Sequence, residues 1–328
     1  MTTLKFDEWQ DVGGTPVMRI NAGVLEVWDG SAWAGAGRGF TNVPYLLIGG
    51  GGAGGTGASY CAGGGGAGGY LEGYLALASG TYSLSIGAGG TNPGTSNQGG
   101  NGTDSTFATL TANGGGGGGI GASTGAVGTQ GASSGGSGNN QSGVTGPDGS
   151  GQGTAGGRGF SALGGGGGGA SLPGNSLDGS WFRLGGRGRN TSLLTPAEAT
   201  TSGVGDIISG GPTGVDEVWF AGGGGGGTDS TSPPDRTADG GYGGGGDGGF
   251  TGYYGGPGPT PGLANSGGGG GGAGWGAAGT PTGGSGVAIL IFPDTVDVTV
   301  SAGLTYQTLS ATNSNKYIFT SGAGTVTF

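Results

Sequence analysis

Short apolar runs recur along the chain between stretches that are almost free of side chains. Runs of four to eight residues that are rich in β-branched and aromatic types and bounded by Gly, Pro or Asn are typical of β-strands. We therefore predict six strands in the central part of the chain. These are VPYLLI (43–48), YLEGYLAL (70–77), TYSLSI (81–86), STFATLTA (105–112), DEVWFAG (216–222) and GVAILIF (286–292).

Two pairs of runs predict hairpins. YLEGYLAL and TYSLSI are separated by a short turn near Ala78 to Gly80, and VLEVW is joined to SAW by Asp29 and Gly30. Asp-Gly between two β runs is a strong hairpin signal. The segment SLLTPAEATTSG is the only candidate helix, and Pro196 limits it to one or two turns. The pattern indicates an all-β fold with no substantial α-helix.

Composition divides the chain into three regions. Residues 1–38 have ordinary content and form a β segment too small to hold a core alone, so we expect it to dock on another protein or pair with copies of itself. Residues 39–293 interleave the predicted strands with glycine tracts. Residues 294–328, with TVDVTVSAGLTYQTLS and KYIFTSGAGTVTF, are predicted to form a C-terminal β-strand segment.

Glycine supplies 100 of the 328 residues, in blocks rather than at every third position. A collagen triple helix requires the strict three-residue repeat and is therefore excluded. Four blocks contain six consecutive glycines each: 114–119, 164–169, 222–227 and 267–272.

Two structures compete for these blocks, a flexible linker and a packed bundle of polyglycine II helices. Glycine loses more conformational freedom on ordering than any other residue, which favours the linker. However, a linker would tolerate Ser, Asn and Thr throughout, whereas closely packed rods of three residues per turn would exclude any side chain. Strand formers also flank each block. We therefore predict rods anchored at their ends by a β core and held together by backbone hydrogen bonds.

The formal net charge is −10, with no histidine and only two lysines, Lys5 and Lys316. Nucleic-acid binding requires several cations, so this function is not expected, nor is binding to anionic membranes. No apolar run approaches the ~20 residues that span a bilayer. The first residues lack a secretory signal, and Cys61 has no partner for a disulfide.

Candidate chemistry is sparse. Matches to G-x-G-x-x-G occur by chance in such a chain, but no helix follows them, and neither lysine follows a glycine as a P-loop requires. The commonest general base is missing because there is no histidine. Four carboxylates in one glycine-rich stretch are either solvated loop acids or oxygen ligands for calcium: Asp229, Asp235, Asp239 and Asp247. A glycosidase with paired carboxylates stays open on the residues alone, but we expect no enzyme, cofactor or metal.

An ordered series of blocks resembles a known family. The series is YLLIGGGGAGG, then GGGGAGGYLEGYLALASGTYSLSIGAGG, then GTDSTFATLTANGGGGGG, and finally GGGGGGAGWG with GGSGVAILIF. It covers about residues 45–292 and resembles the glycine-rich domain of bacteriophage tail fibres and receptor-binding adhesins. The resemblance implies a jelly-roll-like β-sandwich with polyglycine II helices packed on it, displayed on a virion. Similar blocks occur in the extracellular region of the anaplastic lymphoma kinase receptor family, but the cysteine framework of that family is missing.

The two ends extend the resemblance. LKFDEWQDVGG is similar to N-terminal strands by which phage structural proteins join a virion. The segment KYIFTSGAGTVTF looks like the strand pair that precedes a glycine-rich block in related proteins, but here it closes the chain. The resemblance implies virion attachment through these residues: Leu4, Phe6, Trp9, Trp28 and Trp33.

Aromatic and arginine residues between the glycine blocks are the candidate receptor-binding residues. Each one singly could fill a gap or cap the sandwich, but loops on rigid scaffolds often carry recognition, and Tyr, Trp and Arg are enriched in binding hot spots. We predict that the loops 174–190 and 228–262 bind a glycan by ring stacking. The residues are Trp181, Phe182, Arg183, Arg187, Arg189, Tyr242, Phe250, Tyr253, Tyr254 and Trp275.

The function that follows is adhesion by a virion appendage, either a tail fibre or its distal adhesin. Its expected partners are other virion proteins and a host cell-surface glycan or outer-membrane protein, with no nucleic acid and no membrane insertion. It would be made in the host cytoplasm and carried on the virion, where fibres are commonly homotrimers. The alternative is a structural virion protein, such as a head decoration or connector, that binds no receptor.

Overall fold

The computed structural model describes the backbone of most of the chain and the side chains from Thr41 onward. The described residues are 8–10, 16–21, 24–28, 33–35, 40–92, 94–123, 125–139, 150–160, 163–174, 183–229, 238–249, 256–276, 279 and 281–328.

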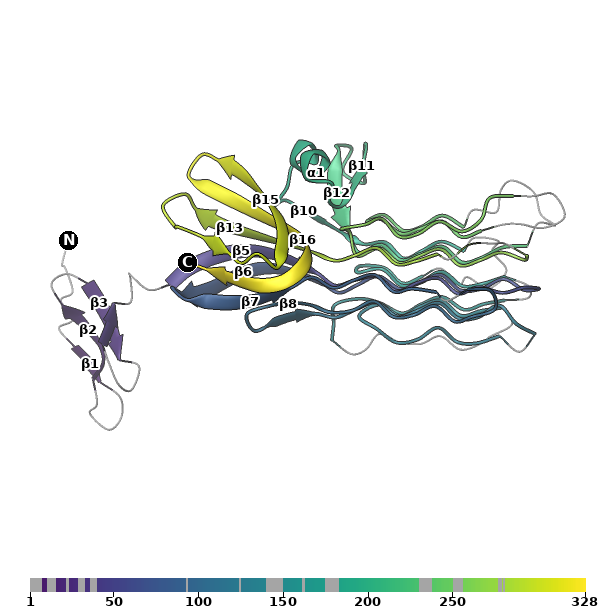
Figure 1. Ribbon diagram of the computed structural model, residues 1–328, viewed down its shortest axis with the longest axis horizontal. Coiled ribbons are helices and arrows are strands. Elements are labelled where there is room, and N and C mark those ends of the chain that lie inside the picture. The colour runs from purple at the N-terminus through teal and green to yellow at the C-terminus, as the bar shows by residue number, and fades with distance from the viewer. Residues whose placement is uncertain are drawn as a thin grey trace.

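The largest sheet has nine antiparallel strands and is nearly barrel-shaped (Figure 1). Its main path runs β6-β5-β13-β16-β7-β8-β9, and β14 and β15 also pair with β16. The strands are β5 (Phe40–Ile48), β6 (Tyr70–Ala78), β7 (Thr81–Ser85), β8 (Ser105–Phe107), β9 (Leu110–Ala112), β13 (Val287–Pro293), β14 (Thr299–Val300), β15 (Leu304–Ala311) and β16 (Ser314–Thr327).

Strand β16 joins the two halves of this sheet. Its first part pairs with β13 and β15, and its last part, from Ala323 to Thr327, pairs with β7 and β14. Between the two parts Gly322 has a φ of +97°, which favours glycine and lets the strand turn from one half to the other. We call this β16-centred unit the sandwich.

Apolar side chains fill both faces of the central strands. In β13, Val287 and Ile289 belong to one core, whereas Ala288, Leu290 and Phe292 belong to the other. Successive side chains of a strand point to opposite faces, so a strand covered on both sides must be apolar throughout. This explains the unbroken run VAILIF.

A smaller sheet and the α-helix found among the described residues cover one of these cores. The sheet has the order β10-β12-β11, with β10 (Arg189–Thr191), β11 (Asp206–Ile208) and β12 (Glu217–Phe220). Helix α1 (Pro196–Ser202) begins at a capping box formed by Thr195 and Glu198 and ends at Gly203 in the left-handed conformation. Lys316 of β16 donates to Glu198 at 2.8 Å and so ties the helix to the sandwich. Among the described residues no helix is long and apolar enough to cross a membrane.

A separate four-stranded sheet forms near the N-terminus. It has the order β1-β2-β3-β4, with β1 (Glu8–Gln10), β2 (Pro16–Asn21), β3 (Val24–Trp28) and β4 (Trp33–Gly35). Trp28 pairs with Trp33, which confirms the hairpin predicted around Asp29 and Gly30.

The other predicted hairpin is wrong. A tight turn links β6 to β7, but β6 pairs with β5, and β7 pairs with β16 and β8. The predicted strand 105–112 is two strands that pair with each other around a turn at Ala108, where φ is +51°. The two-turn helix is confirmed, and β10 and β11 were not predicted.

The glycine tracts form long rods that run side by side away from the sandwich (Figure 1). The rod 49–57 shows how they are joined, because its N–H groups donate in turn to three neighbouring rods with a period of three residues. Gly49, Gly52 and Gly55 donate to Gly69, Gly66 and Gly63 of the first rod. Gly50, Ala53 and Thr56 donate to Thr103, Gly100 and Asn97 of the second rod. Gly51 and Gly54 donate to Gly284 and Pro281 of the third rod, and all these distances are 2.8–3.0 Å.

A period of three residues is that of the polyglycine II helix. These tracts therefore form the predicted rods and are not flexible linkers. The same rod also accepts bonds from three further rods, for example from Gly115, Gly90 and Gly270. A Cβ at Gly54 would overlap the carbonyl oxygen of Gly271. The rods therefore pack so closely that most of these positions admit only hydrogen as a side chain. We call the bundle of these glycine-rich rods, which come from several segments between residues 49 and 286, the rod array.

Candidate recognition surface at the rod ends

The rod array has two ends, which we call the sandwich end and the distal end. Rods leave the sandwich at strand termini such as Ile48, run to the distal end and return (Figure 1). The first distal turn is at residues 58–60. Other turns, such as 131–133 and 242–244, lie at the sandwich end, because Ala132 donates to Gly114 and Gly243 donates to Asp206 of β11.

Two exposed aromatic residues lie at the distal end. The Phe160 side chain is 53% exposed and the Trp275 side chain is 49% exposed. Backbone hydrogen bonds place them at the same end. Phe160 pairs with Leu163, and the next residue, Gly164, donates to Gly227. Trp275 lies two residues beyond Ala273, whose carbonyl oxygen accepts from Ala62. The distal end therefore presents aromatic side chains on a rigid support.

Three of the predicted binding residues lie at the opposite end, near β10 and β12. The guanidinium of Arg187 lies 5.0 Å from the centre of the Tyr242 ring, and that ring makes an edge contact with Trp219 at 5.9 Å. The guanidinium of Arg189 lies 5.8 Å from the ring of Tyr70. The contact between Tyr242 and Trp219 joins the array to the small sheet, and the contact between Arg189 and Tyr70 joins the small sheet to β6 of the sandwich. The structure thus brings Arg187 and Tyr242 together, but far along the rods from Trp275.

The predicted loops are not loops throughout, which corrects the prediction. Residues 183–188 are a rod, and 228–262 contains the rods 238–242 and 245–249 and all but the last residue of the rod 256–263. The Arg183 side chain is 2% exposed, so it is not a surface cation. The other predicted residues lie outside the described residues: Trp181, Phe182, Phe250, Tyr253 and Tyr254.

One of the four acidic residues, Asp247, has a structural role, and its charge affects a second, Asp239. The Oδ1 atom of Asp247 accepts from the backbone N–H of Gly240 at 2.8 Å. Partial burial raises the pKa of the Asp239 carboxyl, and the negative charge of Asp247 raises it further. No group of three His, Cys, Asp or Glu residues suited to a metal occurs in the described part of the chain. Asp235 lies outside that part.

The predicted attachment residues are described only in part. Trp9, Trp28 and Trp33 lie in β1, β3 and β4, where the backbone alone is described. Leu4 and Phe6 lie outside the described residues.

Sequence reasoning missed Phe160. The available signal was its place in RGFSALGGGGGG, an aromatic residue separated by three residues from the glycine block that follows. Trp275 was predicted as one of the aromatic residues that lie between the glycine tracts of the last glycine-rich region.

Comparison with known proteins gives one match. A family model described as a glycine-rich domain matches residues 27–293. The match ends at the last residue of β13, so the C-terminal strands that complete the sandwich lie outside it. No curated protein and no solved structure matches the chain.

Proposed function

Because the chain belongs to the glycine-rich domain family, we propose that it is a phage virion appendage, a tail fibre or distal adhesin that binds the host surface without covalent chemistry. The observation that supports this most is the pair of exposed aromatic side chains, Phe160 and Trp275, at the distal end of a rigid array. Rods that are hydrogen-bonded to their neighbours along their length hold such side chains in place. Less conformational entropy is therefore lost on binding.

The chemistry of this end suits a glycan or the rim of an outer-membrane protein. Aromatic faces stack on the apolar faces of sugars, and each such contact is weak. Several copies on one particle would convert weak contacts into avidity. The N-terminal segment 1–38 would attach the chain to other virion proteins, and the copies would be arranged as a homotrimer or as a cap on a trimeric shaft. The protein would be made in the host cytoplasm and act on the virion.

Competition for adsorption tests the proposal. Purified protein should reduce adsorption of the phage that carries it at micromolar concentrations. The double variant Phe160→Ala with Trp275→Ala should compete at least tenfold less well, because it removes two exposed rings of the distal end. Tyr74→Ala is the matched control, since Tyr74 is 71% exposed but lies on β6 in the sandwich. Its competition should equal that of the unaltered chain.

The alternative, a structural virion protein without receptor binding, predicts different results. It predicts no competition by the unaltered chain at any attainable concentration. A chain that lacks residues 1–38 tests attachment to the virion separately from recognition of the receptor. If the truncated chain still enters virions in normal amounts, the attachment assignment is wrong whatever the competition assay shows.

A further inference from the structure

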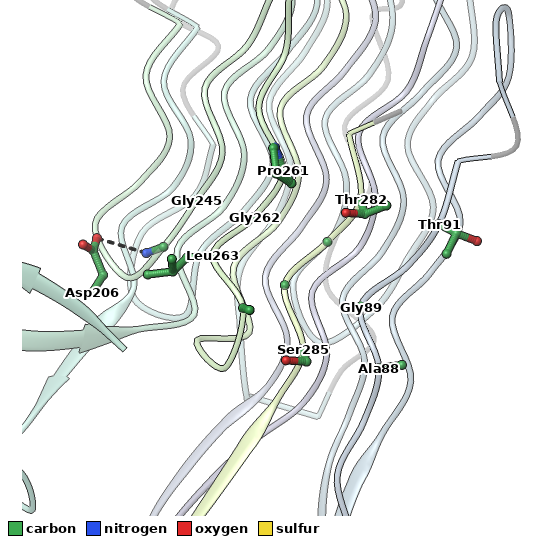
Figure 2. Close-up of a pocket in the computed structure, with 14 residues that line it drawn as sticks. Ala88, Gly89, Thr91, Asp206, Gly245, Pro261, Gly262, Leu263, Thr282 and Ser285 are labelled. Carbon is green, nitrogen blue, oxygen red and sulfur yellow. Dashed lines mark hydrogen bonds between the residues drawn. The ribbon is translucent and has the colours of Figure 1, made fainter. Parts of the chain in front are cut away.

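A groove runs along the side of the rod array near the sandwich end. It lies over the rod 281–286, between the rods 86–92 and 256–263, and has a volume of about 830 Å³ (Figure 2). The side chains along it are small or apolar: Ala88, Thr91, Pro261, Leu263, Thr282 and Ser285.

The floor of the groove is a rod whose hydrogen bonding is incomplete. On its buried sides, Gly283 donates to Gly90 at 2.9 Å and Gly284 donates to Gly268 at 2.8 Å. On the groove side, the N–H groups of Thr282 and Ser285 have no hydrogen-bond partner within the described part of the chain. Thr282 and Ser285 are three residues apart, one turn of the rod, so their N–H groups point the same way about 9 Å apart.

The walls show the same pattern. In the rod 86–92, the N–H groups of Ala88 and Gly90 are bonded, but among the described residues nothing pairs with the N–H or the C=O of Gly89 between them. In the opposite wall the C=O groups of Pro261 and Gly262 also lack partners in the described structure. The rods that border the groove therefore carry backbone groups without partners in the described structure, and those of Thr282 and Ser285 follow the three-residue period of the rod array.

The charges near the groove argue against an ionic ligand. Of the described residues that line it, Asp206 alone is charged, and its Oδ2 atom already accepts from the backbone of Gly243 and Gly244 at 3.0 and 3.1 Å. None of these described lining residues is a Lys or Arg that could hold an anion. What the groove offers is backbone hydrogen bonding next to short apolar and hydroxyl side chains.

We propose that this groove is a vacant position of the rod array and binds a glycine-rich segment of a partner protein in the polyglycine II conformation. The bonds that join rods inside the chain would continue into the bound segment, as a peptide strand extends a sheet at its edge. Glycine is required where the segment faces the floor, because a Cβ there would hold the two backbones apart. A neutral segment also fits better than a second copy of this chain, since two copies with a net charge of −10 each repel one another.

A titration of the full-length protein with hexaglycine, followed by the amide NMR signals, tests the proposal. The signals of Gly89, Thr282 and Ser285 should shift as the peptide binds, and their amide protons should exchange at least tenfold more slowly. The amide of Gly54, which is already bonded inside the array, should not change. A hexapeptide with Val at its two central positions should not bind, because its side chains prevent close approach.

Two matched variants locate the binding. Ala88→Trp places a large side chain in the groove at an exposed residue and should weaken hexaglycine binding at least tenfold. Ala76→Trp adds the same side chain at an exposed residue of β6 and should leave binding unchanged. The amide spectrum of each variant shows that it folds.

Three results would overturn the proposal. The first is the lack of any shift at the three groove amides at millimolar hexaglycine. The second is equal binding by Ala88→Trp and the unaltered chain. The third is a dimer of the unaltered chain in sedimentation that Ala88→Trp dissociates, because this would assign the groove to a second copy.

Discussion

The sandwich and the rod array are adjacent parts of one chain that are stabilised in opposite ways. In the sandwich, side chains such as Leu290, Phe292 and Phe319 are buried against one another, and the backbone is paired within sheets. In the array there are almost no side chains to bury, and each backbone is paired with up to six neighbours. Apolar burial drives the first arrangement, and the sum of many modest hydrogen bonds drives the second.

Because they are stabilised differently, the two regions tolerate different substitutions. A core of side chains is sensitive to the loss of atoms, because lost atoms leave a cavity. An array of bare backbones is sensitive to the gain of atoms, because there is no space for a Cβ. Four experiments examine this contrast, in order of decreasing effect.

Removing a buried ring should destabilise the sandwich most. Phe319 is completely buried, and its ring lies 5.6 Å from that of Tyr306. Phe319→Ala should lower the free energy of unfolding by about 3–5 kcal/mol, measured by chemical denaturation. Tyr74→Ala, at an exposed ring, should change it by less than about 0.5 kcal/mol. Similar effects of the two substitutions would show that the apolar core does not stabilise the sandwich.

The reactivity of Cys61 reports on the closure of the array. This thiol lies at the distal end of the rod 61–69, and burial raises its pKa from 9.0 to about 12. At pH 8 that leaves about a thousandfold less thiolate, the nucleophilic form. A disulfide reagent should therefore label the native chain about a thousandfold more slowly than the denatured chain. Native labelling within tenfold of the denatured rate would mean that the rods are open.

Adding one methyl group should destabilise the array. Gly54→Ala places a Cβ against the carbonyl oxygen of Gly271 and should cost about 1–3 kcal/mol. Gly80→Ala is the control, since the nearest atom to its new Cβ would be 3.7 Å away. The difference between the two unfolding midpoints is the measurement. If both variants are equally stable, the rods are not closely packed.

The smallest effect concerns the contact between α1 and the sandwich. Partial burial by itself raises the pKa of Glu198, but hydrogen bonds from Lys316 and Thr195 outweigh it, so the net pKa is lower than the usual 4.5. The stability that this carboxylate contributes is therefore present above pH 4.5 and is lost as the pH falls below that value. Glu198→Gln should cost about 1 kcal/mol at pH 7. This difference should shrink on acidification towards pH 3, and a difference independent of pH would contradict the assignment.

Much of the fold could be predicted from the sequence, and the reasons are local. The runs in β5 and β13 are apolar on both faces, and the six-glycine blocks admit few structures other than rods. The hairpin between β6 and β7 was wrong because strand partners depend on distant residues, here Phe40–Ile48 and Ser314–Thr327. Strands β10 and β11 have three residues each, too few to show a period.

The candidate site was harder to predict. Identical glycines do not show which rods are neighbours, so neither the side groove nor the separation of Arg187 from Trp275 is visible in the sequence. The burial of Arg183 was also unexpected, because arginine is mostly an exposed residue. In contrast, the two-turn helix 196–202 was predictable, because its capping and proline signals lie within the segment itself.

Amide hydrogen exchange in the glycine blocks tests the central claim most directly. If the rods are cross-linked to one another, the bonded amides within 114–119 and 267–272 should be protected as strongly as those of β13. Exchange of these glycines at the rate of an unstructured peptide, while β13 stays protected, would contradict the account.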